Sequence, residues 1–110
     1  MGMAGVWVLS QWLVLARGRL VTSPELEREL CDLRGRAREA MAREDYAEAH
    51  RALLVAISVN DEDLESAVLW AELMERMGRP REARRGWNRV LALDRGEVHR
   101  RAALDALASL

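Results

Sequence analysis

The chain has 110 residues and lacks phenylalanine and lysine altogether, and it contains only one cysteine, one tyrosine and two prolines. Because Cys31 has no second thiol to pair with, an internal disulfide is excluded and the fold does not require an oxidising compartment. The seven glycines are scattered, which excludes a glycine-rich phosphate-binding loop. No stretch alternates between apolar and polar residues for long enough to require a sheet, so the sequence predicts an all-α protein.

Charge and length narrow the classes of function. The formal net charge is −1, whereas a general nucleic-acid binder needs a positive excess to displace counterions from phosphates, so we expect no nucleic-acid partner. Half of the residues are apolar and 32% are charged, which is typical of a folded helical domain. All 17 cationic residues are arginines, a bias that indicates a GC-rich genome and a bacterial source.

Residues that carry chemistry do not form a recognisable site. His50 and His99 fall on different predicted helices, and no metal-ligand or acid-base motif accompanies them. The acidic stretch 60–63 lacks the glycine and the distal glutamate of a calcium loop, and helix-start carboxylates explain it better. Cys31 has no partner motif that marks a nucleophile. We therefore expect no catalytic residue, no metal, no cofactor and no small-molecule substrate.

Capping signals predict the first pair of helices. Ser23 followed by Pro24 and an acidic first turn predicts a helix that begins there and runs to about Arg43. Its apolar stripe recurs at helical spacing, at Leu26, Leu30, Leu33 and Ala37. Asp45 can cap a second helix, which ends near Val59.

Similar signals predict the helices that follow. The stretch 60–63 is a turn and a helix start, Gly78 ends that helix, and Pro80 opens the next one, because glycine suits a helix end and proline suits a first turn. Residues 94–96 form the next turn, and residues 97–109 are predicted to form a terminal helix.

Residues 37–56 and 71–90 repeat one pattern at an interval of 34 residues. Each copy has a small residue, a turn, a Glu-Ala pair and a large apolar residue four positions after the alanine. A fixed period of this length indicates helical hairpins that pack side by side. The matched pairs are Ala37 with Ala71, Ala49 with Ala83, Leu53 with Trp87, and Ala56 with Val90.

This pattern resembles the tetratricopeptide repeat (TPR) family, with two repeats over residues 30–97 and a solvating helix after them. Arg36 departs from the pattern, because an apolar residue is usual at that position. The resemblance implies stacked antiparallel helical hairpins, a TPR-like α-solenoid over residues 23–110, with the hairpins at 30–59 and 64–93. It also implies a protein-binding groove along the first helix of each hairpin.

Residue by residue, the resemblance implies a partner-binding groove that consists of Arg34, Arg38, Met41, Val68, Leu69, Glu72 and His99, with Ala102 and Ala103 beside them. We expect a helical or extended partner segment there, with its carboxylates on the two arginines. The alternative for the three large apolar residues is that neighbouring helices bury them. A second surface carries three arginines at four-residue spacing, Arg81, Arg85 and Arg89. We expect this face to be solvated; the alternatives are that it binds an acidic partner or anionic lipid.

Residues 1–22 do not belong to the repeats. Between Met1 and Ala16 only Ser10 and Gln11 are polar, and so apolar a segment needs a cover: a bilayer, the protein's own groove or a partner subunit. A signal peptide fits less well, because no positive charge precedes the apolar run. The predicted membrane or partner anchor consists of Val6, Trp7, Leu9, Trp12, Leu13, Leu15, Arg17 and Arg19.

These observations predict a non-enzymatic adaptor for protein-protein interaction, an accessory subunit or assembly factor that residues 1–22 attach to a membrane or a membrane complex. The two arginines after the apolar run would place the repeats on the cytoplasmic side. The alternative is a soluble cytoplasmic adaptor or regulatory subunit, in which the first segment packs on the repeats or forms a homodimer contact.

Overall fold

The computed structural model describes residues 23–110, and within that range the chain forms helices and connecting turns without strands. The all-α prediction is confirmed for this part of the chain. In order, the helices are α2 (Pro24–Ala42), α3 (Tyr46–Val59), α4 (Leu64–Arg76), α5 (Pro80–Leu93) and α6 (Arg100–Ser109).

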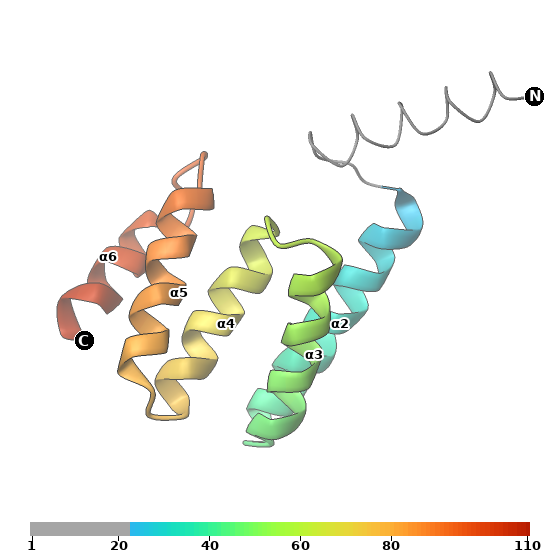
Figure 1. Ribbon diagram of the computed structural model, residues 1–110, viewed down its shortest axis with the longest axis horizontal. Coiled ribbons are helices and arrows are strands. Elements are labelled where there is room, and N and C mark those ends of the chain that lie inside the picture. The colour runs from blue at the N-terminus through green and yellow to red at the C-terminus, as the bar shows by residue number, and fades with distance from the viewer. Residues whose placement is uncertain (1–22) are drawn as a thin grey trace, which may run out of the picture.

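The helices pair along the chain. Helices α2 and α3 form one antiparallel hairpin and α4 and α5 form another, each closed by a short turn (Figure 1). Helix α4 contacts both helices of the first hairpin, and α6 packs against α5 at the far end. Helix α4 therefore lies in the middle of the arrangement, which decides how much of its surface is buried.

Four of the helices begin where the sequence predicts: α5 starts at Pro80, and side chains cap the other three at the predicted places. The Ser23 hydroxyl accepts a hydrogen bond from the N–H of Leu26 at 3.1 Å, and the Asp45 carboxylate accepts one from Glu48 at 3.3 Å. Asp63 caps α4 in the same way, by accepting from the N–H of Ser66 at 3.1 Å. Each bond satisfies a backbone donor that the first turn of a helix leaves without a partner.

The two hairpin turns have the same backbone geometry. Glu44 in the first turn has φ 62°, and Gly78, 34 residues later, has φ 72°. After the first of these residues the N–H of Asp45 donates to the carbonyl of Ala40 at 2.8 Å, and the equivalent bond in the second turn measures 2.9 Å. Helices α2 and α4 are thus both followed by a residue with a left-handed backbone conformation. The N–H group of the next residue then donates to a carbonyl in the last turn of the helix.

The buried residues also recur at the repeat interval. Ala37 and Ala71 are both fully buried, and so are Ala49 and Ala83. Small side chains at these positions let the helices of a hairpin approach closely. Helices α4 and α5 pack closely at Gly86, because a Cβ atom there would lie 2.9 Å from the Cα and Cβ of Ala71.

The terminal helix begins later than predicted. It starts at Arg100 rather than near residue 97, because Glu97 has φ 56°, which no residue in a right-handed helix adopts. The Asp94 carboxylate holds this turn by accepting from the N–H of Val98 at 3.0 Å and of His99 at 2.6 Å. The helix therefore begins one residue after His99, the second of the two residues whose N–H groups Asp94 binds.

The predicted N-terminal anchor, residues 1–22, lies outside the described residues. Among residues 23–110, no helix has both the length and the apolar character that crossing a membrane requires.

Candidate functional site

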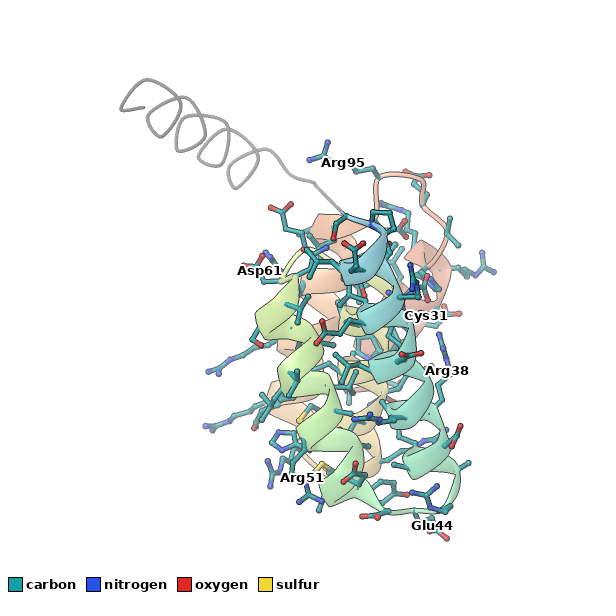
Figure 2. The ribbon with its side chains drawn as sticks, turned by 90° about the vertical axis from the view of Figure 1, so that its right-hand side faces the viewer. Cys31, Arg38, Glu44, Arg51, Asp61 and Arg95 are labelled. Atoms are coloured by element: carbon teal, nitrogen blue, oxygen red, sulfur yellow. The ribbon has the colours of Figure 1, made fainter. Side chains whose placement is uncertain are left out.

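The predicted partner-binding groove runs along α2 and α4 to the start of α6. Arg38 is exposed on α2, and Figure 2 shows it with Cys31 on one side of the molecule, while Arg51 and Asp61 lie on the other side. Glu72 on α4 is half-buried. These two residues present opposite charges on neighbouring helices, and they remain available to a partner.

The three large apolar residues predicted for this groove are in the core. Met41, Val68 and Leu69 are 4%, 8% and 6% exposed. Met41 and Leu69 share one buried cluster, in which α2 and α4 meet, and Val68 belongs to a second cluster with residues of α5 and α6. The expectation that they line an accessible surface is therefore corrected. They are buried because α4 has packed neighbours on most of its sides.

Arg34 forms an ion pair within the chain. Its guanidinium binds both carboxylate oxygens of Asp63, at 2.9 and 2.8 Å, and both side chains are largely buried, at 17% and 15% exposure. Burial lowers the pKa of Arg34, but the hydrogen bonds and charge of Asp63 outweigh that effect and leave the pKa above its ordinary value. This ion pair joins α2 to the start of α4. Arg34 therefore connects the two hairpins, and its guanidinium is not available to a carboxylate on a partner.

His99 is also engaged within the chain. Its Nε2 atom lies 2.8 Å from a carboxylate oxygen of Glu65 on α4. Together with the Asp94 turn, this contact fixes the start of α6 against α4. His99 therefore has a structural partner, while part of its ring stays accessible, at 23% exposure.

A groove that the repeat pattern does not predict lies on the opposite side, between α3 and α5 with α4 beneath. We call it the α3–α5 groove; its volume is about 220 Å³. Four residues with little or no polarity form its floor and inner walls: Ile57, Ala67, Trp70 and Gly86. The ring of His50 on α3 stacks on Trp70, with centroids 5.0 Å apart and planes inclined by 30°.

Charged residues surround this apolar floor. On α5 the groove is lined by Arg85 and Arg89. Asp61 and Asp63, which directly precede α4, line it at that end. The Arg89 guanidinium donates to the backbone carbonyl of Asp61 at 3.1 Å, and among residues 23–110 neither Arg85 nor Arg89 forms an ion pair. Arg81, one turn earlier on α5, is exposed as well.

One part of this groove carried a signal in the sequence and another did not. The spacing of Arg81, Arg85 and Arg89 predicts a cationic edge, which agrees with their exposure on α5. Trp70 was missed as a groove residue, because the repeat pattern indicates only that an apolar residue is usual at its position. The equivalent residue of the first copy is Arg36, which is exposed.

The thiol of Cys31 is exposed on α2. Within residues 23–110, no three histidine, cysteine, aspartate or glutamate side chains come close enough to hold a metal ion. Comparison of the chain with family models, curated proteins and solved structures finds no match.

Proposed function

We propose that the protein is a non-enzymatic adaptor in which two TPR-like helical hairpins hold a binding surface for another protein. In this proposal residues 1–22 attach the adaptor to a membrane or a membrane complex. It would serve there as an accessory subunit or assembly factor, with the hairpins on the cytoplasmic side.

The observation that carries the proposal is the recurrence of local geometry at 34 residues. The turns at Glu44 and Gly78 share a left-handed backbone, and the alanines at 37 and 71 are equally buried. Such equivalence supports a TPR-like stack, because a stack consists of units that repeat one local structure and contact only their neighbours. Stacked hairpins provide a rigid extended surface, and proteins built this way use that surface to bind other proteins.

The exposed charges on α2 and α4 support partner binding on the predicted side. Arg38 and the partly exposed Glu72 remain free of ion pairs among residues 23–110. A partner segment with one acidic and one basic side chain would complement them. The apolar residues of the original prediction are left out of this contact, because they are buried.

Co-purification from native membranes tests the binding role. Tagged full-length protein should retain a reproducible set of partners, and the charge-reversed variant Arg38→Glu, Glu72→Arg should lose at least part of that set. Arg36→Glu is the matched control, because Arg36 is exposed on the same helix. An identical partner set for all three proteins would contradict the role of this surface, and purified protein that turns over a small substrate would contradict the adaptor class.

Fractionation tests the attachment. The full chain should sediment with membranes, and a chain that begins at residue 22 should not. If the full chain is soluble and monomeric without detergent, membrane attachment is wrong, and packing of the first segment on the hairpins takes its place. A soluble full-length dimer that residues 1–22 maintain would instead favour a homodimer contact.

A further inference from the structure

We propose that the α3–α5 groove binds an acidic amphipathic segment of a partner protein. An apolar side chain of that segment would enter the groove against Trp70 and Ile57, and carboxylates one helical turn apart would bind Arg85 and Arg89. This inference rests on the proposed adaptor function and deepens it, because it places a second contact on the side opposite Arg38.

The floor of the groove suits an apolar side chain. Trp70 is half-buried even with His50 stacked on it, so part of the indole still faces the groove. Gly86 lines the groove next to the indole, because a Cβ atom there would lie 3.3 Å from the Cδ1 atom of Trp70. Leu54, one turn before Ile57 on α3, is 47% exposed and extends the apolar surface of that helix. A volume of about 220 Å³ accepts one or two large side chains, not a whole helix.

The charges at the groove favour an acidic occupant. Asp63 already holds Arg34 with both of its oxygens, so its charge is compensated within the chain. Arg89 binds the backbone carbonyl of Asp61 and not its carboxylate. The guanidinium groups of Arg85 and Arg89 thus lack an ionic partner among the described residues, and a guanidinium binds a carboxylate best, through two parallel hydrogen bonds.

The protein's own first segment does not complement these charges. Residues 1–22 contain Arg17 and Arg19 and no aspartate or glutamate. If this segment entered the groove, it would bring positive charge towards the arginines of α5 and leave them unpaired. The four-residue spacing of Arg85 and Arg89 instead matches two glutamates four residues apart on a partner helix, because both spacings correspond to about one turn.

A synthetic peptide provides the test. A fluorescein-labelled amphipathic helix, with leucines on one face and glutamates four residues apart beside them, is titrated with the full-length protein and followed by fluorescence anisotropy. We expect binding that weakens about tenfold in the variant Arg85→Ala, Arg89→Ala, because each ion pair lost at these exposed arginines is worth about threefold. The same peptide with glutamines in place of the glutamates should bind as weakly to the unchanged protein.

Two further variants separate the groove from general charge. Arg43→Ala, Arg100→Ala removes the same charge from exposed positions on other elements and should leave the affinity unchanged. Ile57→Glu places a carboxylate at the groove floor and should weaken binding as much as the double arginine variant. Far-UV circular dichroism checks that each variant is folded.

Four results would overturn the inference. They are failure of the acidic peptide to bind, equal affinity for the glutamine peptide, binding that requires removal of residues 1–22, and groove-dependent binding to anionic lipid vesicles but not to the peptide. If the peptide fails while the partners that depend on Arg38 and Glu72 still co-purify, the groove inference fails and the adaptor function stands.

Discussion

The two hairpins share one pattern of buried residues, yet three of the equivalent positions at which they differ distinguish their surfaces, their close contacts and their turns. At the first position α2 has Arg36, which is exposed, and α4 has Trp70, which α3 and its His50 partly cover. The exposed Arg36 has no residue stacked on it among the described residues. A groove with an aromatic floor therefore forms only where a second hairpin packs on a first one.

The second and third differences concern close contacts and turns. Ala52 in α3 corresponds to Gly86 in α5, where a Cβ atom would lie only 2.9 Å from Ala71, so the glycine allows the two helices to pack closely. Glu44 corresponds to Gly78, so the first turn holds a side chain in a backbone region that glycine adopts more easily. The second hairpin thus has glycine at both the close contact and the turn. The first hairpin has a larger residue at each of these two positions.

The largest expected effect on stability is at the pair of large apolar residues, Leu53 in the first hairpin and Trp87 in the second. Trp87→Ala should lower the free energy of unfolding by about 3–5 kcal/mol, because Trp87 is 4% exposed and its indole also donates to Glu75. Trp87→Leu, which places the residue of the first hairpin in the second, should cost less than Trp87→Ala. Urea denaturation followed by circular dichroism measures both. Equal losses would show that the two positions are not equivalent.

The next effect distinguishes the caps of α2 and α4. Asp63→Ala should cost about 2–4 kcal/mol, since it removes the cap and leaves the largely buried Arg34 without its partner. Ser23→Ala, which removes only the cap of α2, should cost about 1 kcal/mol. The same denaturation assay compares them. Similar values would mean that the Arg34 pair adds nothing to stability.

A smaller effect is expected at the close contact. Gly86→Ala should cost about 1–2 kcal/mol, because the displacement of Ala71 outweighs the better helix propensity of alanine. The reverse change in the first hairpin, Ala52→Gly, should cost about 1–2 kcal/mol, because glycine has the lower helix propensity and a buried methyl group is lost. A stabilised Gly86→Ala protein would show that α4 and α5 can separate at no cost.

The smallest effect concerns the turns, and its sign differs between them. Gly78→Ala should destabilise the protein by about 1 kcal/mol, and Glu44→Gly should leave stability unchanged or raise it by up to about 1 kcal/mol. Thermal unfolding of both variants resolves the signs. The prediction would be wrong if Glu44→Gly destabilised the protein by as much as Gly78→Ala.

Predictions were accurate where the interacting residues are close in sequence and wrong where they are far apart in sequence. The helix starts at Pro24 and Leu64 were predicted correctly, because each depends on a cap three residues from its hydrogen-bond donor. The start of α6 was predicted too early, because the turn predicted at residues 94–96 extends to His99, where the Asp94 carboxylate accepts from N–H groups four and five residues away. Arg34 was assigned to a partner because its true partner lies 29 residues further along the chain.

The sequence by itself determined the all-α class, the helix boundaries at Ser23, Asp45 and Gly78, and the spacing of the small buried residues. These features depend on backbone groups and side chains within about one turn of each other, which local preferences decide. The tertiary structure alone decided that Leu69 is buried, that Arg34 pairs with Asp63, and that Trp70 lies beneath a groove with arginines on one wall. Each of these depends on which helix packs against which, because burial and charge pairing arise only when distant segments meet.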